Sequence, residues 1–187
     1  PETPLTGAAV PLSGAFGRGG IFRLGDVVLR PYRRGGLVRY LNRSTYSGPD
    51  RFQREFEVHA RLYQAGFPTV EPLGFAFRRR GLGWQGVFLT RWLAATPWPA
   101  DWSLSATLLP ALAVAIRALS EGGYWAPDLN ATNVLVTPAG ALQLLDWDRT
   151  TLVPPGGLIS AYKTRMLRSL QKLGAPSDVV AEFTALL

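Results

Sequence analysis

The residues best suited to chemistry lie in the second half of the chain, where two carboxylates and an amide follow one another. Asn133 comes five residues after Asp128, and Asp146 comes eighteen residues after it, with hydrophobic runs and a turn between them. In phosphoryl transfer, oxygen ligands for a hard cation such as Mg²⁺ must converge beside a base. The pattern therefore predicts a site in which Asp128 deprotonates a hydroxyl while Asn133 and Asp146 hold metal.

Each of these three residues also has an ordinary structural explanation when it is considered alone. Asp128 follows Pro127 and could simply hydrogen-bond its own backbone in a turn. Asn133 and Asp146 could be a loop residue and a strand-end residue without a further role. The set as a whole, with two hydrophobic segments separating its members, favours the chemical interpretation.

The elements expected around the set would bring its members together. Two short strands, at residues 134–136 and 142–145, are predicted to flank a turn, so that Asp146 follows the hairpin that Asn133 precedes. In the helical segment before them, Pro110 must start or kink a helix. A last amphipathic helix is predicted to begin near Ile159.

The first half of the chain is richer in strands. A hairpin is predicted at residues 21–30, because Gly25 and Asp26 suit a tight turn between two β-rich runs. Apolar residues at helical spacing then predict a helix at residues 49–65. Two further strands, joined by a Gly-rich turn, are expected at residues 73–80 and 87–92.

A strand-rich lobe, a short hinge and a helical lobe together form the plan of protein kinases. The sequence is therefore expected to adopt an α+β, bilobal protein-kinase-like fold. Its small β-rich lobe with one helix would span residues 1–93, and a hinge would lie at residues 94–101, where prolines break regular structure. A reduced helical lobe, which carries the catalytic and metal-binding loops, would span residues 102–187.

Kinases hold the nucleotide with a Gly-rich turn and with a cation that pairs with a helix Glu. Gly14, Gly17 and Gly19 precede the first strand, where backbone amides could approach phosphate, although a flexible linker is the alternative. Arg30 ends a strand at the position where Lys is usual, and Glu55 on the following helix is its natural partner. For Glu55 the alternative is a solvated helix charge. His59, on the same helix, is expected to pack rather than to catalyse.

Composition narrows the class of protein further. The 187 residues contain no cysteine, which excludes disulfides, and one histidine, which excludes a multi-histidine metal site. The net charge of +7 comes almost entirely from Arg and suits an anionic partner, although it could equally reflect coding bias. The aromatic residues do not alternate with Arg, so no nucleic acid is expected as a partner. Neither a membrane-spanning run nor a secretion signal is apparent.

With these residues in view, the chain resembles the 3-deoxy-D-manno-octulosonic acid (Kdo) kinases of the lipopolysaccharide kinase family. The resemblance runs from about Gly14 to Leu173 and includes a Tyr-Arg-Arg-Gly-Gly loop that is the most family-specific part. The segments that carry it are residues 29–37, 54–56, 66–72, 128–135, 145–149 and 168–173.

The resemblance implies ATP- and Mg²⁺-dependent phosphorylation of a sugar hydroxyl, most simply on Kdo attached to a lipid A precursor. Asp128 would be the base, Asn133 and Asp146 the metal ligands, and Arg30 with Glu55 the pair that orients phosphate. The acceptor would be an anionic sugar or glycolipid. The protein would be a cytoplasmic monomer that could lie peripherally on the inner membrane. Candidate contacts for the acceptor, with a solvated basic loop as the alternative, are Arg33, Arg34, Arg39 and Arg43.

Two departures from the family pattern keep other functions open. Ala126 occupies the position, two residues before Asp128, where the family usually has His, and Arg30 replaces the usual Lys. One alternative is a kinase-like phosphotransferase for another sugar, an aminoglycoside or a protein. The other is a non-enzymatic pseudokinase that uses its basic surface to bind lipids or a partner.

Overall fold

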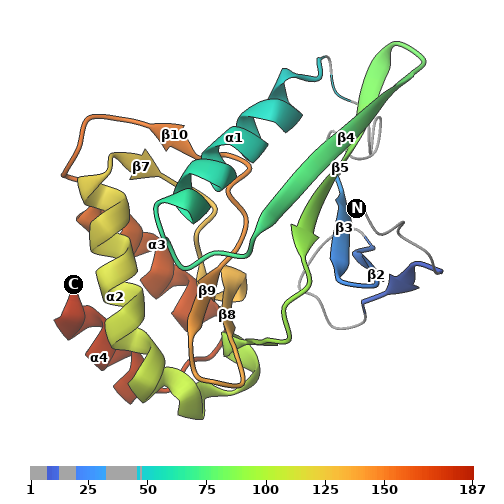
Figure 1. Cartoon of the computed structure of the whole chain (residues 1–187). Coiled ribbons are helices and arrows are strands. Elements are labelled where there is room, and N and C mark those ends of the chain that lie inside the picture. Colours follow the sequence, from blue (N-terminus) through green and yellow to red (C-terminus); the bar gives the residue numbers. More distant parts are fainter. Residues whose placement is uncertain (1–7, 13–19, 33–45, 47) are drawn as a thin grey trace. The chain divides into compact units, whose positions relative to one another are not determined.

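The structure is a computed structural model that describes residues 8–12, 20–32, 46 and 48–187. The chain divides into two compact units (Figure 1). The first unit comprises Pro1–Tyr63 and Val70–Leu93, and the second comprises Gln64–Thr69 and Ala94–Leu187. In the described residues the longer strands lie in the first unit and three of the four α-helices in the second, in agreement with the α+β class.

An antiparallel sheet of five strands forms the framework of the first unit, in the order β1-β2-β3-β5-β4. The predicted hairpin is present, and Gly25 at its turn has a φ of 56°, a left-handed conformation that suits glycine. The third strand of the chain, β3, therefore ends with Arg30 and Pro31 inside the sheet, beside β5. The strands are β1 (Val10–Pro11), β2 (Phe22–Leu24), β3 (Val27–Pro31), β4 (Pro72–Arg80) and β5 (Gly83–Arg91).

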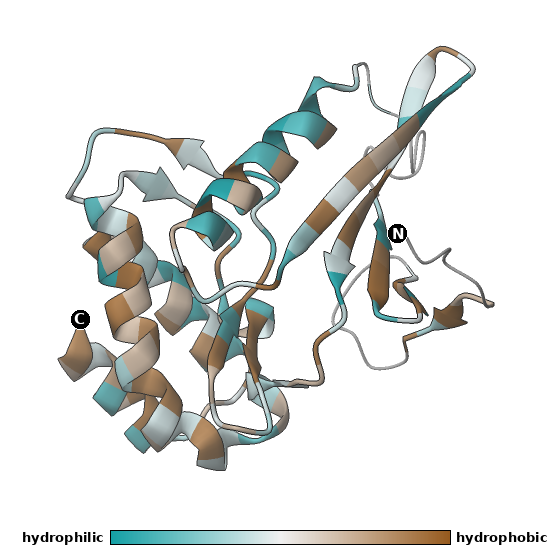
Figure 2. Cartoon of the chain, viewed as in Figure 1, coloured by the Kyte–Doolittle hydropathy of each residue, from teal (hydrophilic) through white to brown (hydrophobic). Residues whose placement is uncertain are grey.

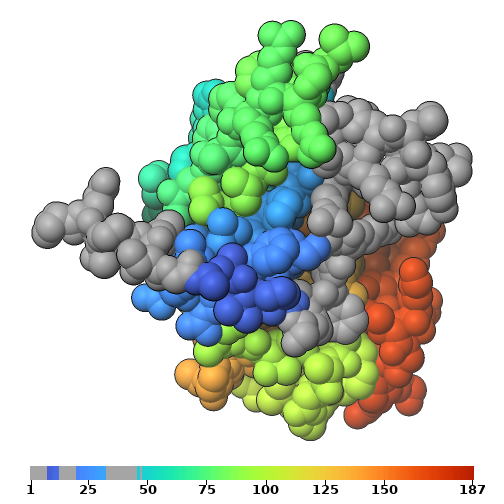
Figure 3. All heavy atoms as spheres, turned by 90° about the vertical axis from the view of Figure 1, so that its right-hand side faces the viewer, coloured from blue at the N-terminus to red at the C-terminus, as the bar shows by residue number. Residues whose placement is uncertain are grey.

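The β4–β5 hairpin is longer than the sequence predicts, because β5 begins at Gly83 rather than at residue 87. Gly86, near the start of β5, is not a turn residue. A side chain at Gly86 would place its Cβ 2.8 Å from the Phe52 ring, so glycine there lets the helix lie close to the strand. The turn itself is at Gly81 and Leu82, and Leu82 is fully exposed; the hairpin is green in Figure 3.

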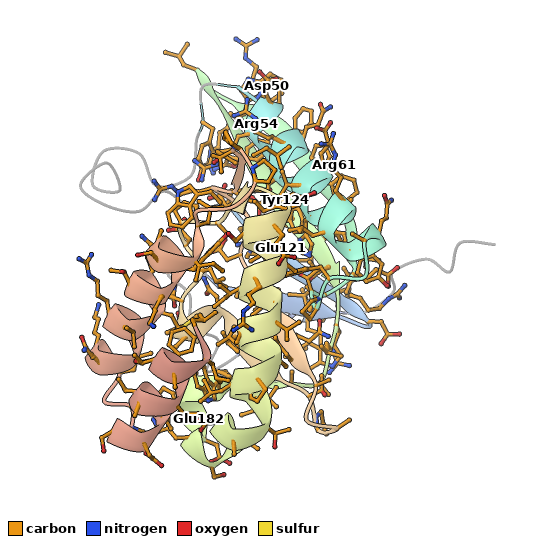
Figure 4. The ribbon with its side chains drawn as sticks, turned by 90° about the vertical axis from the view of Figure 1, so that its left-hand side faces the viewer. Asp50, Arg54, Arg61, Glu121, Tyr124 and Glu182 are labelled. Carbon is orange, nitrogen blue, oxygen red and sulfur yellow. The ribbon has the colours of Figure 1, made fainter. Side chains whose placement is uncertain are left out.

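Helix α1 (Asp50–Gln64) packs its aromatic face on this sheet. The ring of Phe52 lies 4.5 Å from that of Tyr32, and the ring of Phe56 lies 5.5 Å from that of Phe75 on β4. Apart from Glu55 and His59, which are buried, the charged residues of the helix lie toward its exposed side, as Figure 4 shows for Asp50, Arg54 and Arg61. The predicted helix is therefore confirmed, and its buried face fixes the position of Glu55.

His59 is a packing residue, as expected from its place on the helix. Its ring stacks on Phe88 at 5.5 Å with an interplanar angle of 4°. Because its Nε2 lies 2.8 Å from the carbonyl of Val70, which can only accept, Nε2 carries the proton of a neutral imidazole. Burial is the main cause that lowers the pKa of His59 to about 4, and Arg30 lowers it further.

The lowered pKa of His59 makes stability depend on pH. Between pH 6.5 and pH 4 the unfolded chain binds this proton more readily than the folded chain, so stability falls as pH falls. We expect a loss of about 2 kcal/mol from this group between about pH 7 and pH 5, measured by urea unfolding. In the His59→Gln variant, which keeps a hydrogen-bond donor, the loss should be smaller by that amount. An equal loss in both proteins would contradict the assignment.

The prediction that prolines break regular structure at residues 94–101 is wrong for most of that segment, which belongs to the second unit. Residues Thr96–Pro97 form strand β6, which pairs with β8. A 3-10 turn at Trp98–Ala100 follows and buries Trp98 completely. The indole Nε1 of Trp98 donates to Ser105 Oγ at 2.9 Å. The segment has regular structure although prolines flank Trp98, because burying a large aromatic side chain contributes strongly to stability.

Helix α2 (Ser105–Glu121) is the apolar centre of the second unit. It contains Pro110 in its interior and buries a continuous row of side chains. By length and composition alone, the helical stretch Trp102–Glu121 would be apolar enough to cross a membrane, with a mean hydropathy of 1.5. Half of its 18-residue apolar window is buried inside the structure, as in a core helix. The buried row contains Leu108, Leu109, Leu112, Ile116 and Leu119.

Short strands and two more helices complete the second unit (Figures 1 and 2). The predicted hairpin is formed by β8 (Val134–Val136) and β9 (Leu142–Leu144), and a second antiparallel pair by β7 (Tyr124–Trp125) and β10 (Thr151–Leu152). Helix α3 (Ile159–Lys172) starts where the sequence predicts, and α4 (Ser177–Leu186) packs on α2 and α3. The loop that carries Asp128 connects β7 to β8 within this unit.

Candidate active site

The loop between β7 and β8 is closed by hydrogen bonds that converge on the backbone of Asp128. The carbonyl of Asp128 accepts from Asn130 Nδ2 at 2.7 Å and from Asn133 Nδ2 at 2.8 Å. Asn130 Oδ1 also caps the following 3-10 turn by accepting from the Thr132 backbone at 2.9 Å. Because the amide nitrogen of Asn133 donates within the loop, its side-chain oxygen is the atom that can ligate a cation.

Asp146 follows β9 and has an unusual backbone conformation. Its φ of 71° is the only positive φ at a non-glycine residue in the described part of the chain. Such a conformation costs about 1 kcal/mol or more and persists where neighbouring contacts enforce it. On its N-terminal side, Leu145 N donates to the carbonyl of Asn133 at 2.9 Å. This bond ties the Asp146 segment to the loop of Asp128 and Asn133.

The residue after Asp146 anchors the segment on its other side. Trp147 is buried, and its Nε1 donates to Thr69 Oγ1 at 2.9 Å. Thr69 Oγ1 in turn donates to the carbonyl of Leu144 at 2.8 Å, and the ring of Phe67 meets the Trp147 indole edge to face. Tryptophan at this position therefore provides a hydrogen bond as well as packing, which a phenylalanine could not do.

The electrostatics of Asp128 show that the predicted carboxylates share one neighbourhood. Burial is the main cause that raises the pKa of Asp128, and the nearby charges of Asp146 and Asp148 raise it further. Two guanidiniums oppose this rise: Arg149 Nη1 lies 3.6 Å and Arg165 Nη2 lies 3.9 Å from Asp128 Oδ1. A carboxylate with a raised pKa accepts a proton more readily, which suits a general base.

The donor atoms available here suit Mg²⁺ better than they suit a metal that takes all of its ligands from the protein. Within the described residues there is no group of three or more His, Cys, Asp and Glu that could hold a metal ion. Asn133 and Asp146 offer one amide oxygen and one carboxylate. Mg²⁺ is usually bound in this way, through one or two protein ligands together with water and substrate phosphates.

Helix α3 supports the loop at the point where the usual His is missing. The backbone N–H of Ala126 donates to the hydroxyl of Tyr162 at 2.9 Å, and that hydroxyl donates to the carbonyl of Tyr124 at 2.5 Å. Two turns further along α3, Ser169 Oγ accepts from the backbone of Ala131 at 3.1 Å. Figure 4 labels Tyr124 just after the end of α2. Tyr162 thus anchors the segment before Asp128, a contact that no local sequence signal marks.

Removing the Tyr162 hydroxyl should loosen this anchor. The Tyr162→Phe change leaves the buried N–H of Ala126 without its acceptor, and we expect a loss of about 1–3 kcal/mol in the free energy of unfolding. If the hydroxyl positions the loop, turnover should fall while KM for the nucleotide stays constant. Tyr63→Phe, at an exposed position, is the matched control. Unchanged stability in Tyr162→Phe would show that the hydroxyl anchors nothing.

In the first unit, the predicted pair of Arg30 and Glu55 is formed. Arg30 Nη2 donates to Glu55 Oε1 in an ion pair that joins β3 to α1. The Glu55 side chain is fully buried, whereas that of Arg30 is about one-third exposed, at 34%. The guanidinium also lies over the Phe88 ring, 5.6 Å from its centroid. The buried carboxylate therefore fixes one edge of the guanidinium, while part of the Arg30 side chain stays accessible to solvent.

Other predicted residues lie outside the part of the chain that the structure describes. Among the nucleotide-binding candidates these are Gly14, Gly17 and Gly19, which remain predictions. The same holds for the acceptor candidates Arg33, Arg34, Arg39 and Arg43. Arg149 and Arg165, which lie beside Asp128, were not predicted as site residues. For Arg149 a signal was present in the sequence, because it ends the segment 145–149, which carries part of the family resemblance. Arg165 can be recognised only from the packing of α3.

The fold of the chain is kinase-like. The structure resembles that of the bifunctional kinase-methyltransferase WbdD with a TM-score of 0.53 and 16% sequence identity. The match covers 89% of this chain and 42% of the WbdD chain. The predicted protein-kinase-like fold is thereby confirmed.

Sequence comparison identifies the family. Residues 14–185 match the lipopolysaccharide kinase (Kdo/WaaP) family, and the chain belongs to it. It is 31% identical over 180 residues to a 3-deoxy-D-manno-octulosonic acid kinase of Xylella fastidiosa (strain M12), covering 85% of this chain and 67% of that protein. It is 32% identical over 169 residues to the kinase of the same name in Xanthomonas oryzae pv. oryzae (strain PXO99A), covering 84% and 68%. The expected family and enzyme class are confirmed.

Proposed function

We propose that this protein phosphorylates a hydroxyl of Kdo on a lipid A precursor, using ATP and Mg²⁺. The observation that carries the proposal is the grouping around Asp128, whose carbonyl binds Asn133 and whose carboxylate is influenced by the charge of Asp146. The relatives named above are kinases of this sugar, which supports the choice of acceptor. An anionic glycolipid also suits the excess of arginine.

In this proposal Asp128 orients the acceptor hydroxyl and takes its proton. Its partly buried position and raised pKa equip it for that role. Asn133 and Asp146 would hold Mg²⁺, which, when bound with ATP, neutralises charge on the phosphates. The hydrogen bonds from Asn133 and Leu145 keep the loops of the base and of the metal ligand in register.

Arg30 would orient the nucleotide phosphates, with Glu55 as its fixed partner. A buried carboxylate restricts the guanidinium to one orientation, so less side-chain entropy is lost when phosphate binds. The fork of an arginine can bind two phosphate oxygens, which an ammonium group cannot do in the same geometry. The glycines at positions 14, 17 and 19 would cover the phosphates, and the arginines at positions 33, 34, 39 and 43 would contact the acceptor.

We also propose that the protein acts as a monomer at the cytoplasmic face of the inner membrane, in peripheral contact with it. This location follows from the acceptor, because a lipid A precursor is anchored by its acyl chains. Flotation with vesicles that contain the Kdo-bearing lipid would test it. Recovery of the protein without vesicles under all conditions would contradict membrane contact but would leave the chemistry intact.

The function is tested with the purified protein, ATP, Mg²⁺ and a panel of acceptors. We expect ADP release with a Kdo-containing lipid A precursor and not with an aminoglycoside or a protein substrate. Preference for another acceptor would indicate a different phosphotransferase. A parallel thermal-shift measurement should show stabilisation by ATP with Mg²⁺. If millimolar nucleotide gives no shift and no acceptor is turned over, the protein is a pseudokinase.

A further inference from the structure

Two arginines from different elements lie beside the carboxylate of Asp128. Arg149 belongs to the segment between β9 and β10, and its Nη1 lies 3.6 Å from Asp128 Oδ1. Arg165 belongs to α3, and its Nη2 lies 3.9 Å from the same oxygen. All three residues are in the second unit, so their arrangement is internal to one compact body.

Neither contact is a strong internal ion pair. Both distances exceed the range of about 2.7–3.2 Å for N–H···O hydrogen bonds. The side chain of Arg149 is 65% exposed and that of Arg165 is 40% exposed, so solvent screens both charges. Exposed pairs of this kind contribute little to stability, and the arginines can exchange Asp128 for another anion at small cost.

Arg165 has donor capacity that the described residues do not use. Its Nε is buried and has no hydrogen-bond partner there. A guanidinium presents its donors in a rigid planar fork that matches two oxygens of a carboxylate or phosphate. Both guanidiniums approach the same carboxylate oxygen and both side chains are partly exposed, so their accessible N–H groups are suited to binding an anionic group of a ligand.

The position of the two arginines relates this anion to the reaction. We infer that Arg149 and Arg165 bind an anionic group of the acceptor, a carboxylate or a phosphate, and thereby hold its hydroxyl against Asp128. The inference rests on the proposed function, in which Asp128 is the base. Kdo carries its carboxylate and its hydroxyls on one sugar ring. An anion bound by guanidiniums that themselves lie 3.6 Å and 3.9 Å from the base would therefore bring a hydroxyl of the same ring into its reach.

Steady-state kinetics of Arg149→Gln and Arg165→Gln test this inference. Loss of a charge-assisted hydrogen bond of about 1.5–3 kcal/mol should raise KM for the acceptor by about 10-fold or more in each variant. KM for ATP should change by less than about twofold, because the nucleotide is not bound by these residues. Arg168→Gln, an exposed position one turn along α3, is the matched control and should behave as the wild type.

Modified acceptors distinguish the two sources of the anion. If the carboxylate is bound, esterifying it should raise KM for the wild type and abolish the difference between wild type and variants. If a lipid phosphate is bound, removing the phosphates from the acceptor should instead raise KM for the wild type and abolish the difference between wild type and variants. Arg149→Lys and Arg165→Lys, which keep the charge, should recover part of the affinity.

The outcomes separate this inference from the function on which it rests. Wild-type turnover of the Kdo acceptor, with unchanged acceptor KM in both Gln variants, would overturn the inference alone. A fall in kcat with constant acceptor KM would also overturn it. If the wild type turns over no Kdo acceptor, the proposed function fails, and the inference fails with it.

Discussion

Asp128→Asn is expected to reduce acceptor-dependent turnover by about 10²–10⁴-fold, the usual contribution of a general base. The amide keeps the size of the carboxylate but cannot accept a proton at neutral pH. The backbone carbonyl of Asp128, which accepts from Asn130 and Asn133, is unaffected. The loop should therefore keep its conformation while it loses its base.

ADP release with and without acceptor measures this effect, and thermal unfolding verifies the fold. We expect the melting temperature to stay near that of the wild type, because removing a charge beside Asp146 and Asp148 offsets the loss of Arg149 and Arg165 as partners. KM for ATP should also be unchanged. Asp178→Asn makes the same chemical change at an exposed position on α4 and should have full activity. Full turnover of the Asp128→Asn protein would show that another group is the base.

Asp146→Asn is expected to have an effect of similar size for a different reason. Loss of a metal ligand removes several kcal/mol of charge stabilisation, which corresponds to a fall in turnover of about 10³-fold at fixed Mg²⁺. The Mg²⁺ concentration that gives half-maximal activity should rise. Asn is the informative replacement because, after Gly, it is among the residues that best tolerate the positive φ of 71° found here.

A titration of activity against Mg²⁺ separates the loss of metal binding from a loss of fold. Asp146→Gly is the companion variant, because it accepts the same backbone conformation without any side chain. Both variants should unfold at temperatures near that of the wild type, since Trp147 and Leu145 still hold the segment. If Asp146→Asn shows the same Mg²⁺ dependence as the wild type, Asp146 is not a metal ligand.

Local patterns were sufficient to predict the elements that carry the site. The hairpin around Gly25, the helix that presents Glu55 and the strands that separate Asn133 from Asp146 depend on turn chemistry and periodicity within a few residues. The grouping of Asp128, Asn133 and Asp146 could be predicted because a short hairpin returns the chain to its starting point. Their catalytic and metal-binding roles remain predictions.

Contacts between distant segments could not be predicted. Tyr162 lies 36 residues after Ala126 in the sequence, yet its hydroxyl anchors the backbone there. Thr69 supports Trp147 over 78 residues, and Trp98 is buried although prolines flank it. Gly86 appears as a turn residue in the sequence but is required by the close approach of Phe52. These features depend on packing between elements, which periodicity within one element does not reveal.

Identification of the phosphorylated product tests the central claim most directly. The purified protein is incubated with labelled ATP, Mg²⁺ and a Kdo-bearing lipid A precursor, the Kdo is released by mild acid, and the position of the label is determined. We predict that the label is found on Kdo, and that omitting Mg²⁺ or substituting Asn for Asp128 removes it. Label on another part of the acceptor, or equal labelling by the Asp128→Asn protein, would contradict the account.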